Sequence, residues 1–126
     1  MSTRCILVAD EDLDTRIILR TLLERDGYAV IEAPTARAAI EAVRQPVSLV
    51  ILNYPMRIDE TMTLSSWLRR QPATRDIPII NLMSRAVPLL MEEAARDGVN
   101  VTMAKPIDVQ RMLDLVAELT HSMVAQ

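Results

Sequence analysis

The stretch Ser48-Leu-Val-Ile-Leu-Asn-Tyr-Pro-Met56 decides the fold, because its aliphatic run ends abruptly at a polar residue, Asn53. A short, continuously apolar run is typical of a strand that is buried on both faces of a parallel sheet. In such sheets, ligands bind just beyond the carboxyl ends of the strands. Asn53 therefore stands where a functional group is expected, although a carboxamide lacks the charge and the nucleophilicity of a carboxylate.

The composition limits the classes of protein to consider. The chain has 126 residues and is expected to form a single domain, residues 1–126 with a core over about 4–120, without a disulfide or metal to stabilise it. Its 14 Lys and Arg against 17 Asp and Glu give a net charge of −3, which provides no electrostatic reason to expect nucleic acid or an anionic membrane as a partner. No apolar stretch is long enough to span a bilayer, and the first residues do not resemble a signal peptide, so we expect a cytoplasmic protein.

Strand-like and helix-like patterns alternate along the whole chain. The expected strands are residues 5–9, 28–32, 48–53, 77–82 and 99–103. Helices are expected after each strand: the first is marked by an apolar repeat, and the last is expected to fray after residue 119. The first repeat consists of Leu13, Ile17, Ile18 and Leu22. This alternation, with short connections, predicts an α/β protein with a parallel sheet covered by helices on both faces.

Polar and charged side chains collect where the expected strands end. They are Asp10 and Glu11 after the first strand, Asn53 at the third, Met83 with Ser84 after the fourth, and Lys105 after the fifth. The stretches that carry them are Ile6-Leu-Val-Ala-Asp-Glu-Asp12, Leu49-Val-Ile-Leu-Asn53, Ile77-Pro-Ile-Ile80 and Lys105-Pro106. In this order and at this spacing, the chain resembles a response-regulator receiver domain of two-component and phosphorelay signalling.

The resemblance covers essentially the whole chain and implies the doubly wound, flavodoxin-like sheet order 2-1-3-4-5. It implies that Asp10 and Glu11 form the acidic pocket that holds Mg²⁺, a cation that prefers carboxylate oxygens. It also implies that Lys105 contacts the phosphoryl group. The phosphoacceptor aspartate of the family falls on Asn53, so the acyl phosphate on which the family depends is lost.

Further departures from the family lie at the positions that respond to phosphorylation. Met83 replaces the hydroxyl residue after the fourth strand, and Ser84 comes one residue late. Thr102 replaces the aromatic residue of the fifth strand. The proline usually found after Met56 is Arg57, and the glycine expected at the start of the third helix is Thr61. Together these departures indicate a natural sequence that has left phosphotransfer behind.

The resulting prediction is a pseudo-receiver that is not an enzyme, requires no cofactor and has a weak or absent Mg²⁺ site. Lys105 is expected to pair with Asp10 or Glu11, and Asn53 to hydrogen-bond Lys105 or a water shared with Asp10. The domain is expected to act through protein–protein interaction, through the face formed by about residues 86–120. The partner would be a histidine kinase, an output domain or another regulator. Because the last helix carries more apolar residues than one buried stripe requires, a homodimer is also a possible assembly.

Three other interpretations remain. In the first interpretation, the domain is a working phosphotransfer receiver that uses another acceptor, such as Asp10, Asp59 or Ser84. In the second interpretation, it is a doubly wound domain that binds a small ligand or nucleotide. The turn formed by residues 10–14 speaks against a phosphate ligand, since it is acidic and contains no glycine. In the third interpretation, the acidic cluster of Asp10, Glu11 and Asp12 is only the solvated start of a helix, where the helix dipole favours carboxylates.

Overall fold

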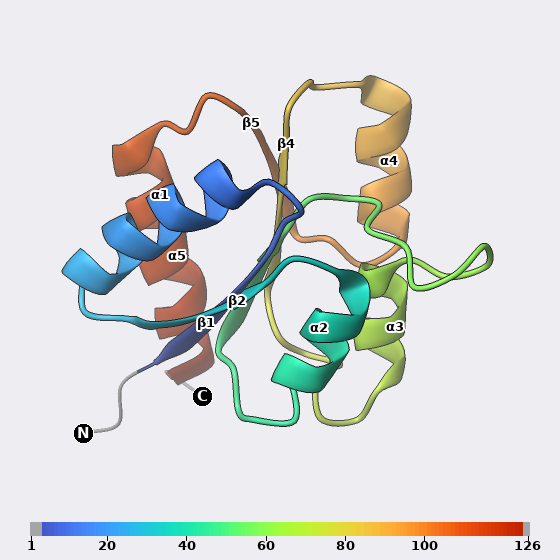
Figure 1. The fold of residues 1–126 in the computed structure, drawn as a ribbon, viewed down its shortest axis with the longest axis horizontal. Coiled ribbons are helices and arrows are strands. Elements are labelled where there is room, and N and C mark those ends of the chain that lie inside the picture. The colour runs from blue at the N-terminus through green and yellow to red at the C-terminus, as the bar shows by residue number, and fades with distance from the viewer. Residues whose placement is uncertain (1–3, 125–126) are drawn as a thin grey trace.

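One parallel sheet with strand order β2-β1-β3-β4-β5 forms the centre of the molecule (Figure 1). The computed structural model describes residues 4–124, and the side chains through residue 121. The strands are β1 (Cys5–Ala9), β2 (Ala29–Ala33), β3 (Leu49–Leu52), β4 (Ile79–Met83) and β5 (Val101–Ala104). The predicted α/β class and the strand order 2-1-3-4-5 are confirmed.

Helices cover both faces of the sheet, as Figure 1 shows. They are α1 (Leu13–Arg25), α2 (Ala36–Ala42), α3 (Leu64–Arg70), α4 (Pro88–Arg96) and α5 (Val109–Val124). One apolar cluster packs α1 and α5 against one face, and a second packs α2, α3 and α4 against the other. None of the helices in the described range combines the length and the apolar character that a bilayer-spanning segment needs.

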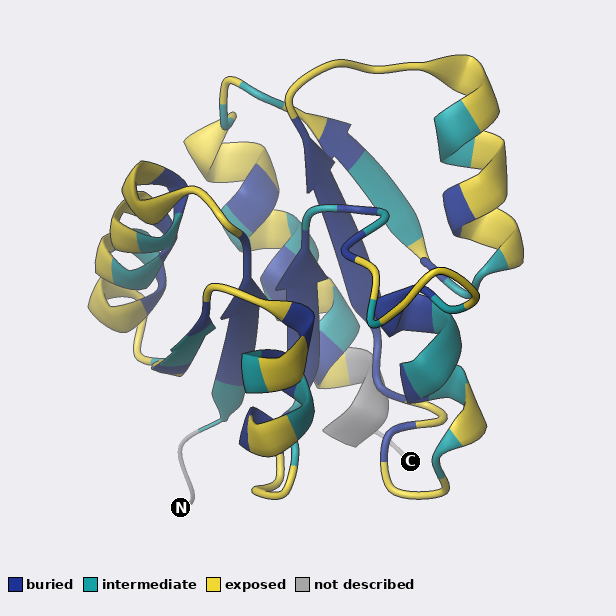
Figure 2. Ribbon diagram, turned by 45° about the vertical axis from the view of Figure 1, so that its right-hand side comes forward, coloured by how far each residue is buried: buried dark blue, intermediate teal, exposed yellow. Residues whose placement is uncertain are grey.

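The strand that follows Ser48 lies at the centre of the core. Each of its residues, Leu49 to Leu52, is at most 1% exposed. Val50 and Leu52 belong to one apolar cluster and Leu49 and Ile51 to the other, so β3 is buried on both faces as predicted (Figure 2). Burying each such side chain stabilises the fold by about 1.5–3 kcal/mol. Because this burial fixes β3 in the centre of the sheet, Asn53 is held directly beyond the carboxyl end of the strand.

The buried face of α1 is not the one formed by the apolar repeat. The apolar repeat correctly indicates a helix, but Leu13, Ile17 and Ile18 are about half exposed, at 56%, 49% and 48%. The face that packs on the sheet is formed by Thr15, Leu19 and Leu23. Both sets follow the same helical spacing, so periodicity alone could not choose between them. Large apolar side chains therefore lie on the outer surface of α1.

Two predictions about the last helix are wrong. The helix continues past residue 119 to Val124, and Thr120 is buried, its hydroxyl donating to the Val116 carbonyl at 2.8 Å; residues 125–126 of the expected frayed tail lie outside the described range. Among the described side chains of α5, the surplus apolar surface is also largely absent, while the side chain of Met123 lies outside the described range. Met112 and Val116 are fully buried, and the remaining leucines pack against the same core cluster: Leu113, Leu115 and Leu119. Val109 stays exposed, at 44%.

Candidate functional site

Asp10 directly follows β1 and is 2% exposed, so its carboxylate needs partners inside the protein. Its backbone N–H donates to the Ala33 carbonyl at 3.1 Å, which fixes it against β2. One carboxylate oxygen, Oδ1, accepts the N–H of Asp12 at 2.9 Å. The other, Oδ2, lies 3.4 Å from the ammonium of Lys105. Both oxygens of this carboxylate therefore already contact protein donors.

Lys105 reaches Asp10 from the far edge of the sheet. Its backbone N–H donates to the Met83 carbonyl at 2.8 Å, just after β5, and the peptide bond to Pro106 is cis. The side chains of the ion pair are 20% and 3% exposed, for Lys105 and Asp10, so salt screens it weakly. The predicted pairing of Lys105 with the acidic pocket is confirmed, with Asp10 as the partner.

Asn53 lies directly beside Asp10, because its N–H donates to the carbonyl of Ala9 at 3.1 Å. Its side chain is half-buried. Among the side chains of residues 4–121, none is hydrogen-bonded to the Asn53 carboxamide, so the predicted direct bond to Lys105 is not formed. Asn53 therefore places a neutral amide next to a carboxylate that is already paired.

The other acidic residues of the cluster face solvent. Glu11 and Asp12 are exposed, and Asp12 occupies the N-cap position of α1. The Thr15 hydroxyl donates to the Asp12 carboxylate at 2.6 Å, and this hydrogen bond lowers the pKa of Asp12. The described part of the chain contains no group of three or more His, Cys, Asp or Glu side chains arranged to hold a metal ion. Asp10 is thus the single buried carboxylate at this edge.

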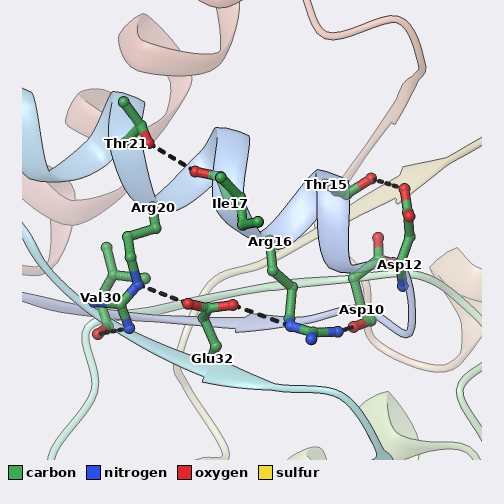
Figure 3. A network of polar contacts seen from close by, with 9 residues as sticks. All are labelled: Asp10, Asp12, Thr15, Arg16, Ile17, Arg20, Thr21, Val30 and Glu32. Atoms are coloured by element: carbon green, nitrogen blue, oxygen red, sulfur yellow. Dashed lines mark hydrogen bonds and ion pairs between the residues drawn. The ribbon is translucent and has the colours of Figure 1, made fainter.

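A second ionic network supports the backbone of Asp10 from α1 (Figure 3). Arg16 donates through Nη1 to the Asp10 carbonyl at 2.7 Å and through Nε to Glu32 at 3.0 Å. Arg20 donates to the other Glu32 oxygen at 2.7 Å. These hydrogen bonds, first that of Arg20, lower the pKa of Glu32. Sequence reasoning missed this network, although two arginines four residues apart and a glutamate inside a strand were visible.

Asn81 was also missed, and it links β4 to β5 and to the residue pair that follows β3. It lies in the middle of β4 and is 0% exposed. Its Oδ1 accepts the backbone N–H of Tyr54 at 2.9 Å, and its Nδ2 donates to the Thr102 hydroxyl at 3.4 Å and to the Met83 sulfur at 3.7 Å. Met83 and Thr102 are thus brought together through Asn81, whereas Ser84 is exposed beyond β4. An asparagine inside an apolar strand was the available signal.

The loop after Asn53 is attached to α4 by Tyr54. This side chain is 4% exposed, and its hydroxyl donates to Asp97 Oδ2 at 2.7 Å. Burial, and then the hydrogen bond to Asp97, raises the pKa of Tyr54 well above its usual range. Thr63, the N-cap of α3, donates to the same Asp97 oxygen at 2.9 Å. A carboxylate at the end of α4 therefore receives two hydroxyl donors from other elements.

Comparison with known proteins decides the family. A family model described as the response regulator receiver domain matches residues 6–117. The chain belongs to the response regulator receiver family. Receiver domains are signalling modules of two-component systems, so the chain has a signalling role, and they are not typically enzymes.

Two relatives illustrate how this receiver domain occurs. A 14.6 kDa protein of the sodA1 3′ region of Leptolyngbya boryana is 32% identical over 114 residues, which is 90% of this chain and 87% of that protein. The transcriptional regulatory protein ZraR of Escherichia coli is 32% identical over 126 residues, and the match covers 96% of this chain but 28% of ZraR. The domain thus corresponds to nearly all of one relative and to a minor part of the other.

Solved structures support the fold. The receiver domain of the sensor histidine kinase PA1611 of Pseudomonas aeruginosa superposes with a TM-score of 0.84 at 19% identity, covering 95% of this chain and 99% of that one. That structure is described with a magnesium ion coordinated in its active-site cleft. At this identity, the likeness shows the fold alone.

Proposed function

We propose that this receiver domain is a pseudo-receiver, a signalling module that is not phosphorylated at residue 53 and acts by binding a protein partner. The observation that carries this proposal is Asn53 at the end of β3, beside the buried Asp10. Forming an acyl phosphate requires a carboxylate nucleophile, and the nitrogen lone pair of a carboxamide is delocalised into its carbonyl. Asp10 and Lys105 thus stand at the carboxyl ends of their strands as in a receiver domain, but the aspartate that would be phosphorylated is replaced by Asn53.

The ion pair of Asp10 with Lys105 supports a site that binds Mg²⁺ weakly or not at all. Asp10 and Glu11 are the residues that would hold the ion, as acidic residues do in the family. However, both oxygens of Asp10 already contact protein donors, Glu11 points into solvent, and Asn53 contributes no charge. Since Mg²⁺ retains its waters unless anionic oxygens compensate, these residues do not fit a stable metal site. The function proposed here requires no cofactor.

The positions that usually respond to phosphorylation also support this proposal. Met83 offers a thioether in place of a hydroxyl, and Thr102 offers a small hydroxyl in place of a ring. Both are contacted by the fully buried Asn81, which occupies the interior of β4 with a fixed set of hydrogen bonds. Ser84 is exposed, but it lies one residue after the position at which the family carries its hydroxyl group.

The partner would dock on the face formed by about residues 86–120, where Val87 and Leu89 are 39% and 76% exposed. A histidine kinase, an output domain or another regulator is the class of partner that a receiver domain serves, and we place this signalling in the cytoplasm. Exposed aliphatic residues of α1 offer a second surface, which includes Leu13 and Ile17. Self-association now has less support, because the leucines of α5 pack against the core.

Intact-mass measurement after incubation with acetyl phosphate and Mg²⁺ tests the proposal. We expect an unchanged mass, while a receiver domain that retains the aspartate gains one phosphate in the same experiment. A one-phosphate gain that hydroxylamine removes would contradict the proposal and identify an acyl phosphate on Asp10 or Asp59. A gain that resists hydroxylamine would indicate Ser84 instead. Asp59 lies away from the site in an exposed turn, where its carboxylate accepts two backbone N–H groups, those of Thr61 and Met62.

A further inference from the structure

Asp97 stands at a helix end that does not favour it. It is the C-cap residue of α4, where the helix dipole disfavours a carboxylate. Two hydroxyl groups from outside the helix donate to one of its oxygens, that of Tyr54 at 2.7 Å and that of Thr63 at 2.9 Å. Tyr54 and Thr63 are both 4% exposed and Asp97 is half-buried, so these bonds are partly shielded from water. Charge-assisted bonds of this kind are stronger than neutral ones.

Tyr54 is held at both of its ends. Its backbone N–H donates to Asn81 inside β4, and its hydroxyl donates to Asp97 at the end of α4. Because Tyr54 directly follows Asn53, the residue at the acceptor position is one peptide bond from this anchor. Asn81 extends the connection to Thr102 on β5. A continuous series of hydrogen bonds thus joins the end of β3 with α3, α4, β4 and β5.

Other attachments of α4 are sparse. Of its residues, Ala94 alone is buried, while Leu89 is exposed and Leu90 and Met91 are half-buried. Figure 2 shows most of this helix as exposed, in contrast to the strands beside it. Elements with few buried apolar contacts open locally at low cost. The position of α4 therefore depends strongly on the polar contacts at its C-terminal end.

We propose that the hydrogen bond between Tyr54 and Asp97 is a latch that fixes α4 to the loop after residue 53. With the latch closed, the acceptor-position loop, the start of α3 and the end of α4 form one unit. Breaking it releases α4 and the loop together. This inference goes beyond the proposed function and does not depend on whether the domain is phosphorylated or which partner it binds.

Hydrogen exchange measured by mass spectrometry on single substitutions tests the latch. In Tyr54→Phe and in Asp97→Ala, we expect amide exchange to rise about fivefold to tenfold in peptides covering α4 and residues 55–62, in line with the loss of one buried hydrogen bond. Exchange in β1 and α1 should stay at the wild-type rate. The double variant should exchange only slightly faster than Asp97→Ala alone, because the additional contact that it loses is the long one of the Tyr54 hydroxyl with Glu93, at 3.5 Å.

Two matched variants control for the chemistry of the changes. Tyr28→Phe removes the hydroxyl of a half-buried tyrosine, and Asp26→Ala removes the C-cap aspartate of α1, which also precedes a glycine. Neither should alter exchange in α4. Asp97→Asn keeps an acceptor oxygen and should preserve most of the protection. Unchanged α4 exchange in Tyr54→Phe, or an increase shared equally by α1 and β1, would overturn the latch.

Discussion

Lys105 Nζ lies 3.4 Å from Asp10 Oδ2, so an ion pair connects the carboxyl ends of β1 and β5 across the sheet edge. Since Asp10 is almost fully buried, this pairing compensates a charge that would otherwise be costly to desolvate. In a receiver domain, the same lysine is expected to face a phosphoryl group. Here its partner is the acidic residue itself, which leaves the site closed by protein groups.

Lys105→Met should increase the affinity for Mg²⁺ about fivefold to tenfold, because it removes a positive charge next to the carboxylate that would bind the ion. Without Mg²⁺, the free energy of unfolding should fall by about 2 kcal/mol, since Asp10 is left buried and without its cation. Isothermal titration calorimetry and urea denaturation measure the two effects. Arg111→Met removes an exposed positive charge on α5 and should change neither. Unchanged Mg²⁺ affinity in Lys105→Met would show that the pair does not close the site.

Glu32→Gln should lower the free energy of unfolding at pH 7 by about 1–2 kcal/mol, because Glu32 accepts from two arginines and is 24% exposed. The arginines lower the pKa of Glu32, so its stabilisation is fully present above its ordinary value of 4.5 and is lost as the pH falls through the lowered pKa. Chemical denaturation at several pH values should therefore show the two proteins converging in acid.

The control for this network is Glu41→Gln, which disrupts a pair whose side chains are 77% and 66% exposed, for Arg44 and Glu41. Exposed pairs contribute little, so its stability should stay within about 0.5 kcal/mol of the wild type. An equal loss in both variants would indicate that the Arg16–Glu32–Arg20 network is no stronger than an ordinary surface pair.

Because of Tyr54, the free energy of unfolding should depend on pH in the alkaline range. Burial and Asp97 raise the pKa of Tyr54 above its ordinary value of 10, so its contribution is present below pH 10 and is lost as the pH rises further. The stability difference between the wild type and Tyr54→Phe should therefore shrink above pH 10, as urea midpoints can measure. Tyr28→Phe should not remove this dependence. A difference that stays constant to pH 11 would exclude Tyr54 as its source.

Much of the fold was predictable, because local patterns determine it. The apolar run at Leu49 to Leu52 indicated a doubly buried strand, and Gly27 and Gly98, with φ of 95° and 97°, mark helix ends at which other residues would be strained. The buried face of α1 was not predictable, since both of its faces carry apolar residues at helical spacing. That choice depends on contacts with β2 and α5, which periodicity does not contain.

The site was predictable where the strand ends alone determine it. Asp10, Asn53 and Lys105 meet at one edge because parallel strands place their carboxyl ends together. Asn81 and Asp97 could not be assigned, because their roles arise from hydrogen bonds to Tyr54, 27 and 43 residues away in the chain. Such pairings require the three-dimensional arrangement of the sheet and α4.

The central claim is that Asn53 leaves the receiver site in one state, and the most direct test is a titration with Mg²⁺ and beryllofluoride followed by amide NMR shifts. Beryllofluoride mimics a phosphoryl group on an aspartate. We predict no change in the shifts of residues in β4, α4 and β5, beyond small effects of Mg²⁺ near Asp10. Saturable shifts that extend through α4 and β5 would contradict the claim, because they would show a site that still changes state.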